Sequence, residues 1–239
     1  MTALFTSPLF EYPKNAEFGR IVAKIKIFER VKPNRKLQDA FASQVKKIVW
    51  RYKLSSKTIN LAETDKLKEI EIFELPLKTE KIDTKVLHCI DKAIGHPIVF
   101  HLTHEDNIKV VATYKRPSEA DTTKWIVDNE YFETDWLLEK SVRQKLPVVL
   151  NLSGLYEYIL RELIPLDSRK DERLEAYIER MGQFLAKGRE YEKLETRMKN
   201  ENQFNRKVEM NAELRVLGDE IENLKKGQSG NKEHKEGQQ

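Results

Sequence analysis

The sequence predicts an α+β fold: a mixed β-sheet of about four or five strands with packed helices, followed by a long C-terminal coiled-coil-like helical arm. Three patterns predict it. Apolar residues alternate with glutamates near residue 70, recur at helical spacing in shorter segments, and repeat every three or four residues from 168 to 226. We therefore expect a globular domain at 1–167, an arm at 168–226 and a disordered polar tail at 227–239.

Composition restricts the class of protein. Charged residues make up 34% of the chain, and no apolar run approaches the roughly 20 residues that span a bilayer. The first five residues lack the basic start and apolar core of a secretory signal. The single cysteine, Cys89, forms no intrachain disulfide, which agrees with a reducing compartment. We expect a cytoplasmic protein with no membrane partner.

The net charge of +4 is unevenly distributed. Residues 1–60 carry thirteen basic and four acidic side chains, a balance of +9. Residues 61–168 carry fourteen basic and twenty acidic side chains, a balance of −6. Such polarity attracts an anionic partner at one end of a globule, although solvated faces with no partner give the same distribution.

A first helix is expected from Pro33 to Lys53, because apolar residues within it fall on one stripe at helical spacing. The opposite side carries basic residues that could lie along a phosphate backbone. These candidate nucleic-acid-binding residues are Arg35, Lys36, Lys46, Lys47 and Lys53.

The segment that follows predicts a strand. Ile70 and Ile72 alternate with glutamates, whereas Phe73 and Leu75 take the other face, which indicates a bulge or coverage on both sides. Pro76 places the end of this strand at a sheet edge.

A second helix begins after Asp83, a good N-cap, and stops at Gly95. Residues 98–103 and 108–114 then form a hairpin around a polar turn.

The rest of the globule is less regular. Residues 125–127 and 131–132 predict one more strand pair or an irregular hairpin. Ser153 caps a last helix, and Pro165 closes the globule.

The arm has two apolar registers. The first contains Tyr177, Met181, Phe184, Tyr191 and Met198. The second, the candidate oligomer interface, contains Met210, Leu214, Leu217, Ile221 and Leu224. A heptad seam must be buried against another helix, and the polar stretch 200–207 predicts a weak joint between two coiled-coil segments. The alternative is a set of shorter helices packed back on the globule.

No motif of known chemistry occurs: there is no Gly-rich phosphate loop, Cys-x-x-Cys, His-Glu-x-x-His or Gly-x-Ser-x-Gly. His96, His101 and His104 could bind zinc together with neighbouring acids. However, His101 and His104 are three residues apart on an extended chain and should point to different faces. We prefer solvated histidines, and expect no metal and no cofactor.

Acidic strand residues leave a metal-dependent nuclease open as an interpretation. Such a site needs two or more acids and a lysine on neighbouring strands. The candidates are Glu69, Glu71, Glu74, Lys78, Glu133 and Asp135. The separation of Glu74 and Lys78 is two residues longer than in the familiar Glu-x-Lys element. Glutamates that keep an outer sheet face soluble are the interpretation we favour.

Several strings occur in a characteristic order: KKIVW at 46–50, TINLA at 58–62, EIEIFEL at 69–75, IDKAI at 90–94 followed by PIVF at 97–100, and YFETDW at 131–136. Together they resemble a bacterial family of unknown function, number forty-three ninety-one, over residues 10–165 and more loosely beyond. Members often have proline where this chain has Gly95. The resemblance implies an accessory component encoded beside helicases and DNA methyltransferases in restriction-like, anti-phage gene clusters. It supplies no catalytic residues.

Three hypotheses follow. The first is a non-catalytic adaptor that docks on a helicase or methyltransferase and forms a homo-oligomer, or pairs with a helical partner protein, through its arm. The second is a sequence-independent DNA- or RNA-binding module that uses the basic N-terminal region. The third is a divergent metal-dependent nuclease. The seam favours the first, the charge distribution permits the second, and the missing Glu-x-Lys element argues against the third.

Overall fold

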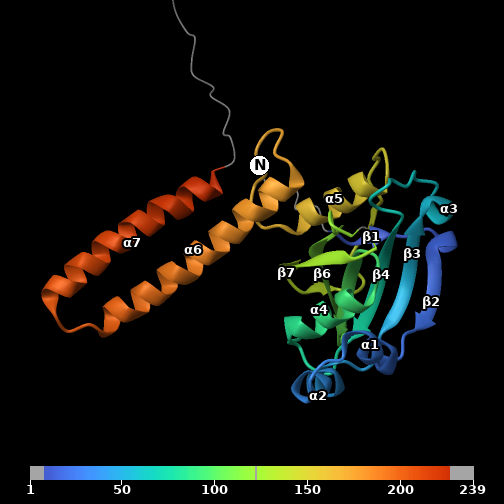
Figure 1. The fold of residues 1–239 in the computed structure, drawn as a ribbon, viewed down its shortest axis with the longest axis horizontal. Helices are drawn as coiled ribbons and strands as arrows, with labels where there is room; N and C mark the ends of the chain where they lie inside the picture. Colours follow the sequence, from blue (N-terminus) through green and yellow to red (C-terminus); the bar gives the residue numbers. More distant parts are fainter. Residues whose placement is uncertain (1–7, 122, 227–239) are drawn as a thin grey trace, which may run out of the picture. The chain divides into compact units, whose positions relative to one another are not determined.

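A computed structural model of the chain describes residues 8–121 and 123–226 (Figure 1). The chain consists of two compact units, 1–164 and 165–239. The predicted disordered tail at 227–239 lies outside the described residues. Among those that are described, no helix combines the length and the apolar character that a membrane span requires.

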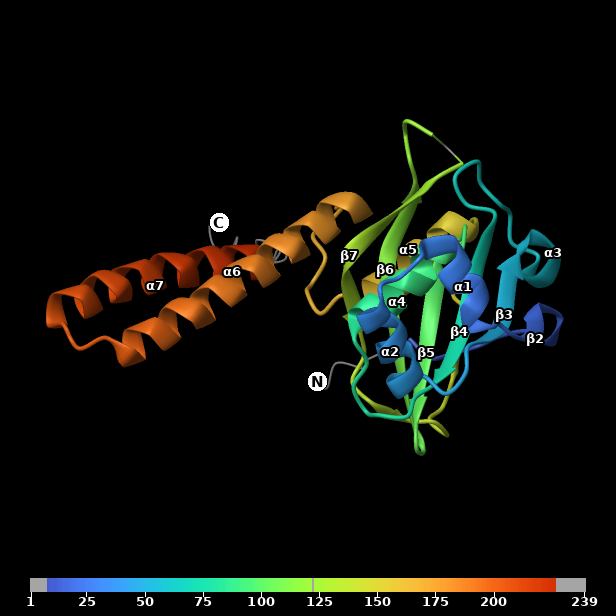
Figure 2. The ribbon, with the colours of Figure 1, turned by 60° about the horizontal axis from the view of Figure 1, so that its bottom comes forward.

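A mixed seven-stranded sheet forms the centre of the first unit (Figures 1 and 2). Six strands follow one another in the order β2 (Glu17–Ile21), β3 (Val49–Ser55), β4 (Glu69–Pro76), β5 (Ile98–His104), β6 (Asn107–Pro117) and β7 (Trp125–Glu133). The seventh, β8 (Leu137–Leu138), pairs with the start of β6. Only β4 and β5 pair in parallel within this sheet, because α4 (Thr84–Ala93) carries the chain back between them. The predicted mixed sheet is confirmed, with more strands than expected.

Helices cover both faces of the sheet. On one face, α1 (Lys24–Val31), α2 (Arg35–Gln44) and α4 share a buried cluster with Phe73 and Phe100. On the other lies α5 (Leu152–Leu163), whose Leu155 and Ile159 are fully buried (Figure 2). This confirms the prediction that β4 is covered on both sides.

Shorter elements complete the unit. They are the strands β1 (Phe10–Glu11) and β9 (Gln144–Lys145), which pair in parallel, the 3₁₀ turn η1 (Lys14–Ala16) and the helix α3 (Ser56–Ile59).

The predicted helix from Pro33 to Lys53 is wrong in its second half. It ends at Gln44, and residues 49–55 form β3 between β2 and β4. Val49, Trp50 and Tyr52 are residue types that favour strands, and pairing with β4 overrides the helical spacing.

Three smaller expectations also need correction. Pro76 ends β4 beside Thr103 of β5, inside the sheet instead of at its edge. Residues 125–133 form one strand paired with β6, not a strand pair of their own. The cap of α5 is Asn151, whose side chain accepts a hydrogen bond from Gly154 N, instead of Ser153.

Local capping signals were otherwise reliable. The Asp83 side chain accepts a hydrogen bond from Lys85 N at 2.9 Å, and α4 ends just before Gly95. The β5–β6 hairpin is present, and its turn contains Glu105 with a φ of 52°.

The second unit is an antiparallel helical hairpin (Figures 1 and 2). Its helices are α6 (Leu174–Asn200) and α7 (Phe204–Lys225), so the expected long helical arm is present as two helices. The polar joint is a turn, and the seam of α7 packs on α6 of the same chain. Leu214 and Leu217 are buried with Leu194, and Tyr191 and Met198 pack against them.

Arg180 closes this hairpin. It makes two hydrogen bonds of 2.8 Å to the carboxylate of Glu172 and donates to Leu224 O at 2.6 Å. Arg169 donates to Asn223 O and to Lys226 O. Two cations therefore satisfy backbone carbonyls at the end of α7 that have no partner within the helix, which is a favourable arrangement.

Candidate functional site

The five predicted nucleic-acid-binding residues lie on three elements. Arg35 and Lys36 begin α2, Lys46 and Lys47 follow it in a connection, and Lys53 lies on β3. The prediction that these residues share one face of a single helix is therefore wrong. Lys53 already forms an ion pair, since its Nζ lies 2.7 Å from Glu69 Oε1. The two residues on α2 and the two in the connection are exposed.

The predicted oligomer-interface residues all lie on α7. Leu214 and Leu217 are 5% and 8% exposed and face α6, and Met210 packs against the same cluster. Ile221 and Leu224 are half-buried. The seam has a partner within its own chain, so any contact with a second chain must use another surface of the hairpin as well.

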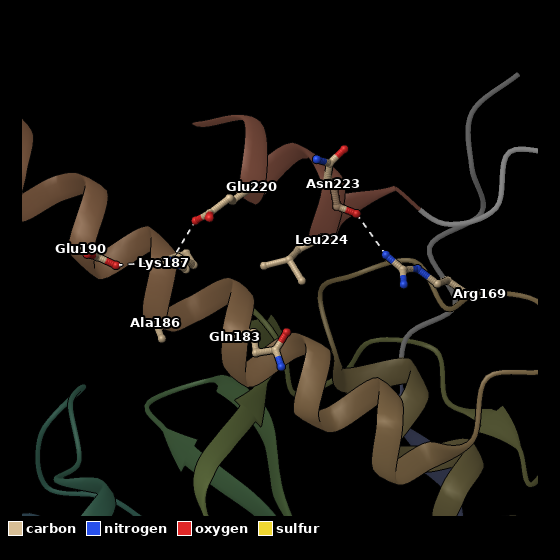
Figure 3. A pocket seen from close by; sticks show the side chains of 8 residues that line it. All are labelled: Arg169, Gln183, Ala186, Lys187, Glu190, Glu220, Asn223 and Leu224. Atoms are coloured by element: carbon tan, nitrogen blue, oxygen red, sulfur yellow. Dashed lines mark hydrogen bonds and ion pairs between the residues drawn. The ribbon is translucent and has the colours of Figure 1, made fainter. Parts of the chain in front are cut away.

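A groove runs along the hairpin between the two helices. One part of it is shown in Figure 3 and is lined by Arg169, Gln183, Ala186, Lys187, Glu190, Glu220, Asn223 and Leu224. A second part shares three of these residues and adds Lys193, Leu194, Arg197, Ala212, Glu213, Val216 and Leu217. We call both parts together the hairpin groove. Lys187 crosses it to form an ion pair with Glu220 at 2.8 Å.

The nuclease candidates of the sequence do not meet as a group. Glu74 lies 3.7 Å from Arg51, and Glu133 lies 2.7 Å from Lys109. The strands that carry Glu74 and Glu133 are separated by two others, which places them about 14 Å apart. The Lys78 ammonium donates to Ala42 O.

The three histidines are likewise separate. His96 lies in the turn after α4, beside Trp125. His101 is buried next to Tyr12, and His104 lies beside Trp136.

Glu69, Glu71 and His96 do come together. The glutamates are at the start of β4, where residues two apart point to the same face. Because Glu71 pairs with Ile98 in the parallel register, the turn before β5 lies beside Glu69. One ligand atom from each of the three residues lies within 4.8 Å of the other two. We call these residues the carboxylate–histidine cluster; within the described chain they are the ones that could hold a metal ion.

Burial controls the chemistry of this cluster. Glu71 is 0% exposed, and burial, together with the nearby charge of Glu69, raises its pKa to about 8. His96 Nε2 lies 3.7 Å from Glu69 Oε2, and burial lowers the pKa of the His96 imidazole. The ammonium of Lys53 on the neighbouring strand balances Glu69.

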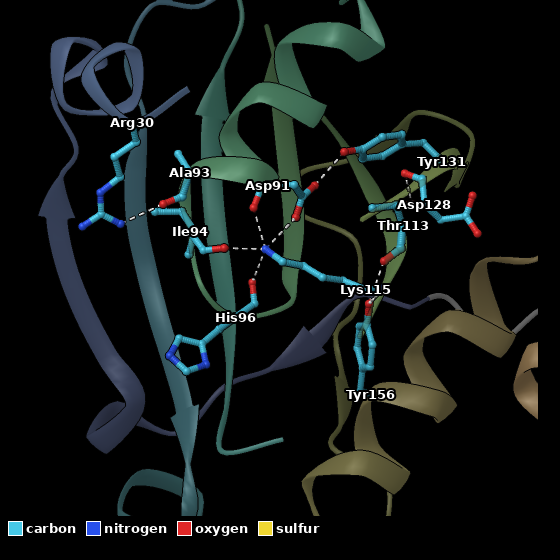
Figure 4. A network of polar contacts seen from close by, with 10 residues as sticks. All are labelled: Arg30, Asp91, Ala93, Ile94, His96, Thr113, Lys115, Asp128, Tyr131 and Tyr156. Carbon is cyan, nitrogen blue, oxygen red and sulfur yellow. Dashed lines mark hydrogen bonds and ion pairs between the residues drawn. The ribbon is translucent and has the colours of Figure 1, made fainter. Parts of the chain in front are cut away.

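A buried lysine orders the turn that carries His96 (Figure 4). Lys115 Nζ donates to the backbone carbonyls of Asp91, Ile94 and His96 at 2.6, 2.6 and 2.8 Å. It also lies 3.7 Å from Asp91 Oδ1, and Asp91 Oδ2 accepts a hydrogen bond from Tyr131 at 2.7 Å. Burial lowers the pKa of Lys115 and raises that of Asp91.

Sequence reasoning missed this network. One signal was readable, because Asp91 lies four residues after Leu87 and therefore on the apolar stripe of its helix.

Comparison with known proteins bears on the family. A family model described as a domain of unknown function (DUF4391) matches residues 10–221. No curated protein and no solved structure matches the chain. The resemblance inferred from the ordered strings is confirmed, and the match also includes most of the hairpin. The chain belongs to the DUF4391 family.

Proposed function

We propose that the protein is a non-catalytic adaptor of a bacterial anti-phage or restriction-like defence complex. In this proposal it docks on a helicase or methyltransferase partner and forms oligomers through α6 and α7, in coiled-coil fashion. One observation supports it above all: α7 has a second apolar side. Phe204, Val208 and Val216 are 77%, 54% and 59% exposed.

These residues form a stripe that the hairpin leaves uncovered. At 100° per residue, Val208 and Val216 lie on the opposite side of α7 from Leu214 and Leu217. A solvated helix needs only one apolar stripe, so a second one favours a second packing partner. Val216 also lines the hairpin groove, so this residue lies at the edge of both the stripe and the groove.

Charge favours another copy of the chain as the partner. The hairpin groove carries Lys193 and Arg197 from α6 and Glu213 from α7, whereas Glu220 of α7 is paired with Lys187 of its own chain and α6 also contributes Glu190. In a two-fold arrangement, α6 of one copy faces α7 of the other, so unlike charges meet. The result would be a four-helix bundle around the stripe residues. The defence role and its helicase or methyltransferase rest on the family resemblance.

Light scattering on the full chain tests self-association. At tens of micromolar we expect an oligomeric mass for the wild type and a monomeric mass for the double variant Val208→Glu/Val216→Glu. The matched control is Val142→Glu/Val148→Glu, because these valines are 88% and 104% exposed in the first unit. A monomeric wild type, or equal masses for the two double variants, would reject oligomerisation through α7.

Nucleic-acid binding remains the second candidate. The exposure of Lys36, Lys46 and Lys47 favours it, since unengaged surface lysines can neutralise phosphates.

A further inference from the structure

The carboxylate–histidine cluster is assembled from two separate parts of the chain. Glu69 and Glu71 come from β4, and His96 comes from the turn between α4 and β5. A divalent ion about 2.0–2.2 Å from each ligand would place ligand atoms about 3–4 Å apart. The three ligand atoms already lie within 4.8 Å of one another, so side-chain rotations alone could complete the geometry.

Glu71 provides an independent indication that a ligand is missing. Its side chain is fully buried, and neither of its oxygens has a hydrogen-bond partner of normal geometry in the described chain. The indole of Trp50 and the carboxyl of Glu69 adjoin it. Among the described residues, His96 Nδ1 is buried without a hydrogen-bond partner as well. A buried carboxyl group whose oxygens lack hydrogen-bond partners is costly, and a bound cation is one of the few groups that would give both oxygens a partner.

The surroundings suit an ion that enters from solvent. The Glu69 and His96 side chains are 23% and 34% exposed, so they form an open side of the cluster. Lys53 contacts Oε1 of Glu69, whereas Oε2 is the oxygen nearer to His96. The ion could therefore bind Oε2 while Lys53 keeps its ion pair. Lys115 holds the His96 carbonyl and limits the freedom of the turn, as outer-shell contacts do in metal sites.

We propose that Glu69, Glu71 and His96 bind one divalent transition-metal ion, of the Mn²⁺ or Zn²⁺ class. Two carboxylates and one imidazole suit these ions better than Mg²⁺ or Ca²⁺, which prefer oxygen ligands alone. Three protein ligands leave coordination positions for water. The ion would give the buried Glu71 oxygens a ligand and link β4 to the turn before β5.

Calorimetric titration of the tag-free full chain with MnCl₂ and with ZnCl₂, after chelator treatment, tests this. We expect one site per chain for at least one of the two ions, and a higher melting temperature when it is bound. Glu71→Gln and His96→Gln should each weaken binding at least tenfold. Glu74→Gln is the matched control, since Glu74 lies on the same strand but pairs with Arg51.

Two results would overturn the proposed metal site. Millimolar or weaker binding of both ions by the wild type would overturn the proposal. Unchanged affinity in Glu71→Gln and His96→Gln would overturn it too, because any ion bound would then lie elsewhere. Val208→Glu/Val216→Glu should bind the ion like the wild type, so the ion site and oligomerisation can fail independently.

Discussion

Replacing Lys115 with methionine should destabilise the first unit more than any surface lysine change. The substitution keeps the length of the side chain and removes its ammonium. Three backbone carbonyls at the end of α4 and in the turn after it each lose a donor, and Asp91, which is 1% exposed, loses its only compensating cation among the described residues. Methionine packs well against the apolar neighbours, so the effect measures mainly electrostatics and hydrogen bonds.

The expected loss of unfolding free energy follows from the burial of the Lys115–Asp91 ion pair. Breaking one partner of a buried ion pair costs about 3–5 kcal/mol, because the other charge is left uncompensated. For a domain of this size, each kcal/mol lowers the melting temperature by about 2–4 °C, so we expect a loss of roughly 10 °C. Adding Asp91→Asn should recover part of the loss, because it removes the stranded charge.

Urea unfolding followed by circular dichroism gives the free energies. The matched control is Lys109→Met on the same strand, since Lys109 pairs with the half-exposed Glu133 and should cost at most about 1 kcal/mol. If Lys115→Met costs no more than Lys109→Met, the network contributes little and the reasoning is wrong. A second readout is ion affinity, which should fall in Lys115→Met because the turn with His96 loosens.

Three other expectations can be tested directly. If DNA binding neutralises about four phosphates, the slope of log affinity against log salt should be near −3.6. Replacing Lys36, Lys46 and Lys47 with glutamine should flatten this slope by about 2.7. An unchanged slope would exclude these lysines as the DNA-binding surface. Burial lowers the pKa of His101 to about 3. The folded state thus excludes a proton that the unfolded state binds below pH 6.5, so His101 by itself should remove about 2 kcal/mol of stability from pH 7 to pH 5. Buried groups such as Glu71 titrate in both proteins, so the test is the difference: the change for the wild type should be about 2 kcal/mol less favourable than that for His101→Leu, and equal changes would refute it. Arg180→Leu should cost about 3–5 kcal/mol and speed hydrogen exchange in α7 but not in the sheet; slow exchange in α7 would contradict the role given to Arg180.

Elements with strong local signals could be predicted from sequence. The start of α4 follows from Asp83, and the β5–β6 hairpin follows from two apolar runs around a polar turn.

Residues 45–52 show where local signals fail. Phe41, Val45 and Ile48 satisfy a helical stripe, and all three are buried, but only Phe41 lies in the helix. The partner strand β4 decides the outcome, and pairing between distant strands is not encoded in local spacing.

The carboxylate–histidine cluster could be predicted only in part, because it too depends on the pairing of strands that are distant in sequence. Glu69 and Glu71 were identified as acids on a strand, whereas His96 was grouped with two histidines that lie near it in sequence. The structure joins His96 to the glutamates through the parallel register in which Glu71 pairs with Ile98. Register depends on how α4 crosses the sheet, and the sequence contains no short-range signal for it. A buried acid with an imidazole beside it is therefore a property of the assembled sheet.

The hairpin shows what a heptad pattern leaves open. The second apolar register of the arm predicts a seam, and two of its residues, Leu214 and Leu217, are buried against α6. A heptad pattern specifies a facing helix but not the chain that supplies it. Here α6 precedes the turn at 201–203, and Arg180 binds the end of α7, so the chain covers its own seam. Once the seam is satisfied internally, the exposed stripe of Val208 and Val216 becomes the informative feature, because nothing within the hairpin explains it.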